Sequence, residues 1–223
     1  MALTLSIALL AGCSGPVYVW DSHTTSAPRP LAFDVAELAG QPVATFAVVA
    51  PSAFQGFGIA LSHALTRALS QASAPFRELP AYQVANTVNE RGLGAEYGDL
   101  LVSFAKSNIL ERDGLQRIGA ALGCRYVLLP GVAAFTQVVS DRFEIAGIKL
   151  VRNQATILRL WLQLWDAQSG SMLWESAGEI TATSEILTAG RSVPLDDVAA
   201  KLWLVMIRDG LLTDPASRGL GGN

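Results

Sequence analysis

Several residue types on which binding and catalytic sites depend are scarce in this chain of 223 residues. It has two cysteines and two histidines, and its only lysines are Lys106, Lys149 and Lys201. Because 19 acidic residues outnumber 16 basic ones and the lysines are scattered, we expect no nucleic-acid-binding surface, which needs clustered cations. The chain is also 51% hydrophobic and 16% charged, with a mean hydropathy of +0.35. This composition excludes an intrinsically disordered protein.

The scarcity of histidine and cysteine also removes most catalytic and metal-binding arrangements. His23, His63 and Cys124 are too widely separated for a zinc-ligand spacing, and no G-x-S-x-G nucleophile motif occurs. The segment Gly56–Gly58 follows an apolar run, but Leu61 stands where a dinucleotide-binding fingerprint needs its third glycine. We therefore expect neither enzymatic activity nor a cofactor or metal site, and a solvent-exposed His63.

The first thirteen residues carry the most specific motif of the sequence. Residues 2–11 form an apolar run of ten residues that only Thr4 and Ser6 interrupt. Such a run is too short to span a bilayer, which takes about 20 residues, but it suits the apolar region of a secretory signal. The following Leu10–Cys13 segment, LAGC, resembles the bacterial lipobox, in which the cysteine is acylated and becomes the first mature residue. No lysine or arginine precedes the run, so a buried amino-terminal strand or helix ending in cysteine stays open as the alternative.

The lipobox implies a division of the chain and a location. We expect a signal peptide over residues 1–12, an acylated cysteine and tether over 13–42, one α/β domain over 43–213 and a flexible tail over 214–223. Fatty acyl chains such as palmitate on Cys13 would anchor the protein in a membrane. Ser14, in place of the Asp that resembles an inner-membrane retention signal, favours the outer membrane, facing the periplasm. Cys124 then has no partner for an internal disulfide, and we expect it to be buried.

Hydrophobic periodicity predicts the secondary structure. The expected strands are 43–49, 76–79, 125–139, 143–151, 156–165 and 172–183, and the expected helices are 58–71, 82–91, 96–106, 115–122 and 195–212. Asp113 is the expected N-cap of the fourth helix, and Gly123 the left-handed residue that ends it. This order predicts an α/β fold, a mixed sheet with helices packed on it, with early βα units and a late antiparallel hairpin.

Three segments in order resemble a known group of periplasmic domains. They are Val43–Val49 with the Gly56–Gly58 turn, Asp113–Gly131 (DGLQRIGAALGCRYVLLPG), and Leu160–Glu175 (LWLQLWDAQSGSMLWE). Together they resemble the α/β domain shared by the curli-secretion lipoproteins, the lipoprotein activators of penicillin-binding proteins, and the amino-terminal domain of TolB. The resemblance implies a non-enzymatic envelope lipoprotein that assists assembly or regulation of an envelope complex through protein–protein contact.

One strand carries a candidate partner-binding patch. Trp161 and Trp165 alternate with apolar residues so that both point the same way, and Trp174 follows on the returning strand. With Arg159 and Gln163 they form the predicted patch, since tryptophan and arginine are enriched where partners bind. The alternative is that the helix over 195–212 covers this face. A deep pocket near Trp161 and Trp165 would instead favour a periplasmic small-ligand-binding lipoprotein.

Overall fold

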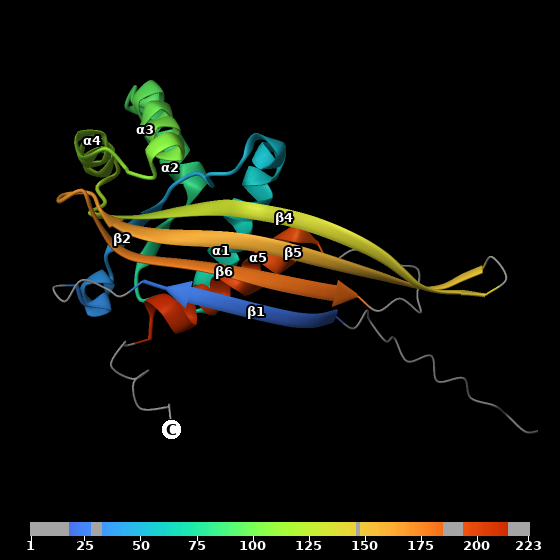
Figure 1. Ribbon diagram of the computed structural model, residues 1–223. Helices are drawn as coiled ribbons and strands as arrows, with labels where there is room; N and C mark the ends of the chain where they lie inside the picture. Colours follow the sequence, from blue (N-terminus) through green and yellow to red (C-terminus); the bar gives the residue numbers. More distant parts are fainter. Residues whose placement is uncertain (1–17, 28–32, 146–147, 185–193, 214–223) are drawn as a thin grey trace, which may run out of the picture.

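A six-stranded mixed sheet with helices on both faces forms the centre of the computed structural model, which describes residues 18–27, 33–145, 148–184 and 194–213 (Figure 1). The strands are β1 (Tyr18–Ser26), β2 (Pro42–Thr45), β3 (Arg77–Leu79), β4 (Tyr126–Ile145), β5 (Ile148–Asp166) and β6 (Ser171–Ser184). The helices are α1 (Gly58–Gln71), α2 (Ala81–Glu90), α3 (Gly94–Ser107), α4 (Arg112–Leu122) and α5 (Leu195–Val205), with short helical segments η1 (Val35–Leu38), η2 (Ser52–Phe57) and η3 (Met206–Leu211). The α/β fold class predicted from the sequence is confirmed.

The order of strands in the sheet is β1-β6-β5-β4-β2-β3. β2 runs parallel to both β3 and β4, whereas β4, β5, β6 and β1 pair antiparallel. The expected late hairpin is present, with Leu164 of β5 opposite Trp174 of β6. The sheet therefore combines early parallel βα units with a late antiparallel meander.

Alternate residues of the long strands enter two separate cores. Leu128, Leu162 and Leu164 pack with α1, α5 and η3 on one face, whereas Val127 and Trp165 pack with α2, α3 and α4 on the other. This division follows from the two-residue period of a strand, which sends successive side chains to opposite faces. Figure 1 shows α2, α3 and α4 gathered at one end of the sheet, so that they cover only part of their face.

Local sequence signals set most helix limits. Helix α1 has the predicted limits, and its buried residues Leu61, Leu65 and Ala68 recur at helical spacing. Gly123 ends α4 with a φ of 65°, as predicted. The N-cap prediction was wrong, because Glu111 occupies that position. Its carboxylate accepts from the N–H groups of Asp113 and Gly114 at 2.9 and 2.7 Å, and the longer glutamate side chain reaches both from a position two residues upstream of Asp113.

Strands β4 and β5 form one long hairpin, which the sequence analysis divided differently. The predicted strand over 143–151 is not a separate strand, since its residues belong partly to the end of β4 and partly to the start of β5. Polar residues at 140–142 and 152–154 interrupt the apolar pattern, but backbone pairing continues through them. Far from the helices, a strand needs no apolar face, and periodicity then marks its limits poorly.

Residues 18–26, assigned to a tether in the sequence analysis, form β1. Every residue of β1 is paired with β6, from Tyr18 opposite Ser184 to Ser26 opposite Ser176. Downstream, Phe33 and Leu38 are buried in the core beside α1. The tether prediction therefore fails for these segments, and the described fold begins five residues after Cys13, which itself lies outside the described residues.

Candidate functional site

The structure does not bring the five predicted patch residues together on one exposed face. Trp165 is only 4% exposed and lies beneath α2, α3 and α4. Trp174 is only 2% exposed and lies on the opposite face of the sheet, beside α5. The alternative that helix 195–212 covers the patch holds for Trp174 alone. Alternation showed which residues share a side of β5, but it did not show which helices lie over that side.

Gln163 connects the buried end of the patch to its open end. Trp165 donates its indole N–H to the side-chain oxygen of Gln163 at 3.0 Å. The Gln163 amide in turn donates to a carboxylate oxygen of Glu175 on β6 at 2.9 Å. Because Gln163 is only 6% exposed and Trp165 only 4%, these hydrogen bonds satisfy buried polar groups of both side chains, which are then unavailable to a partner.

Trp161 lies at the edge of the part of the sheet that α2, α3 and α4 cover. Its ring lies 5.5 Å from that of Phe104 in α3, and it is half-buried. On the adjacent strand it lies against Gly131, where a Cβ would lie 1.9 Å from the indole Cζ2. Beyond Trp161, the face formed by β5, β6 and β1 has no helix over it among the described residues.

This uncovered face, which we call the open face, is polar. Its residues are Ile157, Arg159, Ala177, Glu179, Thr181, Asp21, His23 and Thr25. Arg159 and Glu179 form an ion pair across β5 and β6, and His23 of β1 lies opposite Glu179. A shallow hollow of about 270 Å³ lies between these residues and Trp161. The open face thus combines an ion pair, the edge of one aromatic ring and a shallow hollow on the surface of the sheet.

Sequence analysis missed the contribution of β1 to the open face. The segment Tyr18–Ser26 reads YVWDSHTTS, which contains aromatic and β-branched residues and neither glycine nor proline. Those residues favour a strand. The prolines and glycines on both sides of this segment suggested a tether, and His23 was placed in it.

A larger hollow lies elsewhere, at the carboxyl ends of the parallel strands. A crevice of about 890 Å³ lies between the end of β2, the first turns of α1 and the start of α2. Its lining is mainly apolar and includes Val48, Ala50 and the 77% exposed Ile59. Crevices at this position of α/β sheets commonly hold ligands.

Polar residues line one wall of this crevice. Arg67 forms ion pairs with Asp196 at 3.0 Å and Asp197 at 3.3 Å, joining α1 to the first turn of α5. His63 is exposed on the same helix, as predicted. Since all three charged partners are substantially exposed, these pairs contribute little to stability, and their main effect is to give the crevice a polar rim.

Glu78 lies beneath the same region, next to α1. The hydroxyls of Thr45 and Thr66 donate to one of its carboxylate oxygens at 3.0 and 3.1 Å. Burial raises the pKa of Glu78, and these two hydrogen bonds lower it only in part. A carboxylate in this position is held by side chains from β2 and α1, so it connects the sheet to its helix.

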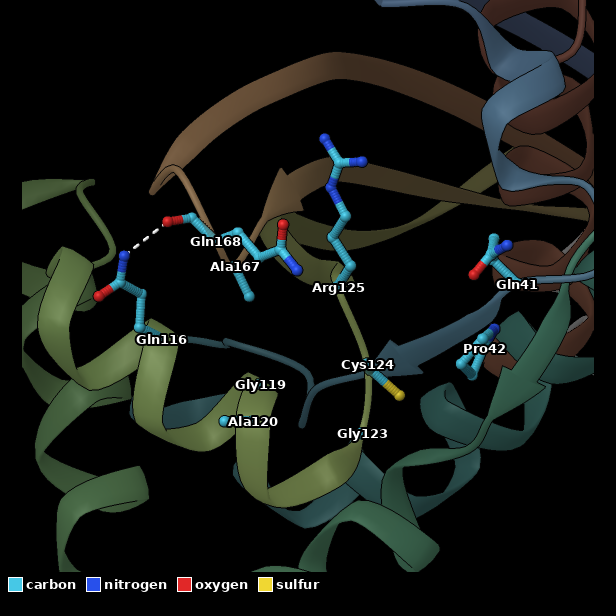
Figure 2. A pocket seen from close by; sticks show the side chains of 10 residues that line it. All are labelled: Gln41, Pro42, Gln116, Gly119, Ala120, Gly123, Cys124, Arg125, Ala167 and Gln168. Carbon is cyan, nitrogen blue, oxygen red and sulfur yellow. Dashed lines mark hydrogen bonds between the residues drawn. The ribbon is translucent and has the colours of Figure 1, made fainter.

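Cys124 lines a third cavity, of about 510 Å³, at the opposite end of the sheet (Figure 2). The side chains of Gln41, Gln116, Arg125 and Gln168 surround it, and Gln116 donates to the backbone carbonyl of Gln168. Cys124 itself is buried, as predicted, and burial raises the pKa of its thiol. A protonated thiol is a poor nucleophile, so Cys124 does not provide the cavity with a reactive group.

Within the residues that the structure describes, no group of three or more histidine, cysteine or acidic side chains is placed to hold a metal ion. No helix in the same part of the chain has the length and apolar character needed to cross a membrane.

Comparison with known proteins finds similarity in structure only. No protein-family model matches the chain, and no curated protein matches it in sequence. Among solved structures, the chain is similar to PelC from Paraburkholderia phytofirmans, solved as a dodecamer, with a TM-score of 0.45 and 13% identity over 83% of this chain and 96% of PelC. It is also similar to lipoprotein GNA1162 from Neisseria meningitidis, with a TM-score of 0.44 and 16% identity over 78% of this chain and 99% of that one. Similarity this weak gives no information about ligand or partner.

Proposed function

We propose that this protein is a lipid-anchored protein of the bacterial cell envelope that acts by binding another envelope protein and not by catalysis. The observation that carries the proposal is the position of the open face, whose edge strand β1 begins five residues after the lipobox cysteine, Cys13. The anchor would be in the outer membrane, with the domain in the periplasm, because Ser14 follows the cysteine.

The short connection determines how the domain would be held. Five residue steps span at most about 18 Å when extended, so acyl chains on Cys13 would keep β1 close to the lipid surface. Several acyl chains anchor a protein stably, whereas one alone binds reversibly. An anchored open face would meet partners that lie at the same membrane.

The three segments that resemble curli-secretion lipoproteins, penicillin-binding-protein activators and the TolB amino-terminal domain support a role in assembly or regulation of an envelope complex. The segment Asp113–Gly131 contains all of α4 except its first residue, the Gly123 turn and the start of β4. Leu160–Glu175 contains the β5–β6 turn. These motifs lie in elements that build the sheet and its helices, so they support the resemblance to these envelope proteins. They do not belong to the open face, where the partner is proposed to bind.

Acylation is tested by growing bacteria that express the full chain with an alkyne-bearing fatty acid. Parent protein is expected to carry the label and to fractionate with the outer membrane. Cys13→Ser is expected to lose both, and Cys124→Ser, the matched control, to keep both. An unlabelled parent chain, or a label that survives Cys13→Ser, would contradict the proposal.

Partner binding is tested by charge reversal on the open face. Arg159→Glu breaks the ion pair with Glu179 and is expected to reduce co-purification of an envelope partner with the full chain. Arg91→Glu changes an exposed arginine at the end of α2, remote from the open face, and is expected to have no effect. Equal recovery of the partner with both variants would exclude the open face as the binding site.

The 890 Å³ crevice favours a second candidate, a periplasmic small-ligand-binding lipoprotein. Its mainly apolar lining and polar rim of His63, Arg67 and Asp196 suit a largely apolar ligand with one polar group. The melting temperature of the full chain is measured with and without such compounds. A rise that disappears in Ala81→Trp, which places a large ring at the wall of the crevice, would favour this candidate over the first.

A further inference from the structure

The outer edge of β1 forms one of the two edges of the sheet within the described residues. β1 is an edge strand of the sheet, and no strand within the described residues pairs with its outer side. Natural proteins commonly protect such edges with proline or lysine. The nine residues of β1 include neither.

The pairing with β6 shows which backbone groups of β1 face outward. The N–H of Ala27 donates to the carbonyl of Glu175 at 3.0 Å, which identifies Ala27 and Glu175 as a hydrogen-bonded pair. In an antiparallel ladder such pairs alternate along the strand. The backbone groups of His23 and Thr25 therefore face β6, and those of Ser22 and Thr24 face outward.

We propose that β1 pairs antiparallel with β1 of a second copy of this chain, about a two-fold axis at Ser22. This register joins the two sheets edge to edge and pairs all nine residues of β1. Tyr18 of one copy then lies opposite Ser26 of the other. Any other centre along the strand pairs fewer residues. The inference does not depend on acylation of Cys13.

Charge complementarity favours the same register. With the axis at Ser22, Asp21 lies opposite His23 of the second copy, and the contact occurs twice. An axis at Asp21 or at His23 would instead place like groups opposite each other, which is unfavourable.

The register also extends a row of basic and acidic residues that the structure already contains. On the open face Arg159 pairs with Glu179, and Glu179 lies opposite His23. Asp21 of the second copy adds an acidic group beyond His23, so that basic and acidic residues alternate across four strands. A two-fold axis perpendicular to the sheet places both open faces on the same side of the dimer, where they form one continuous surface.

Cysteine cross-linking tests the register in the full chain, purified in detergent. Ser22→Cys places two cysteines about 5.5 Å apart between Cα atoms, a separation that a disulfide spans. Thr24→Cys is the matched control. In the proposed register, the cysteines at position 24 of the two copies are offset by four residues, about 13 Å along the strand. This separation is too large for a disulfide.

Oxidation of Ser22→Cys is expected to give a product of twice the chain mass, absent from Thr24→Cys and from the parent chain. Cross-linking of Thr24→Cys in place of Ser22→Cys would overturn the register. A Ser22→Cys product of another mass would show that a different protein occupies the edge.

Sedimentation tests the dimer without a new cysteine. Ser22→Pro removes an N–H that faces away from β6, so β1 keeps its bonds to β6 while the outer ladder loses two bonds, one from each copy. The parent chain and Ser22→Ala are expected to sediment as dimers, and Ser22→Pro as a monomer. A parent chain that is monomeric at every concentration would overturn the proposal.

Discussion

The indole ring of Trp161 lies directly against the backbone of Gly131, at a distance that admits no side chain. A Cβ on Gly131 would lie 1.9 Å from Cζ2 and 2.0 Å from Cε2 of the ring. Because Gly131 of β4 has no side chain, Trp161 of β5 can lie against the backbone of β4 and contact Phe104 of α3.

Substitution of Gly131 by Ala is expected to displace this ring and destabilise the fold. Overpacking of this kind typically lowers the free energy of unfolding by about 1–3 kcal/mol, measured by urea denaturation of the full chain. Gly98→Ala is the control, because Gly98 lies within α3 with no atom near its missing Cβ. It is expected to stabilise the protein by about 0.5–1 kcal/mol. Equal stability of Gly131→Ala and the parent would show that the ring is free to move.

Asp166→Asn is expected to destabilise the β5–β6 turn in a pH-dependent way. Burial alone would raise the pKa of Asp166, but hydrogen bonds from Arg125 and from the N–H groups of Gln168 and Ser169 outweigh it and lower the pKa. A carboxylate with a lowered pKa stabilises the folded state above its unfolded pKa, near 3.8, and this contribution disappears as the pH falls through the folded pKa.

At neutral pH, Asp166→Asn is expected to lower the free energy of unfolding by about 1.5–3 kcal/mol, typical of hydrogen bonds to a charged group, and this difference is expected to shrink toward pH 3. Glu179→Gln is the comparison, since it breaks an exposed ion pair with Arg159 that contributes at most about 1 kcal/mol. Denaturation of both variants across this pH range measures the difference, and a loss for Asp166→Asn that does not change with pH would contradict the assignment.

Glu78→Gln is expected to have the opposite effect. Burial raises the pKa of Glu78, so the folded state binds its proton more tightly than the unfolded chain does. Stability from this group is then complete below its unfolded pKa, near 4.5, and is lost as the pH rises through the folded pKa. Glutamine keeps an oxygen that accepts from Thr45 and Thr66 without the desolvated charge. The variant should be more stable than the parent at pH 7 and not at pH 4, whereas an equal difference at both would contradict burial as the cause.

Cys124 is expected to react slowly with thiol reagents. It is 4% exposed, and burial raises the pKa of its thiol, so little thiolate is available at neutral pH. Its labelling rate in the folded chain should be at least about tenfold below that in urea, because reaction requires local opening. Cys13→Ser provides a chain whose only cysteine is Cys124. Equal rates in the presence and absence of urea would show that the adjacent cavity admits the reagent.

The sequence alone determined those elements in which neighbouring residues carry the whole signal. Helix α1 has its predicted limits because apolar residues recur every three to four positions, and α4 ends at Gly123 because a left-handed residue suits glycine. The β5–β6 hairpin followed from the alternation in residues 156–165 and from the turn residues of Asp166–Gly170.

Tertiary structure decided what lies against each of these elements. Alternation placed Trp161 and Trp165 on one side of β5, but only the packing of α2–α4 buries Trp165 and leaves Arg159 open. Tyr18–Ser26 forms a strand because β6 supplies a partner for its backbone, a partner more than 140 residues away in the sequence. Local patterns record how a segment folds and which residues share a face, whereas burial and strand pairing depend on segments that meet only in the folded chain.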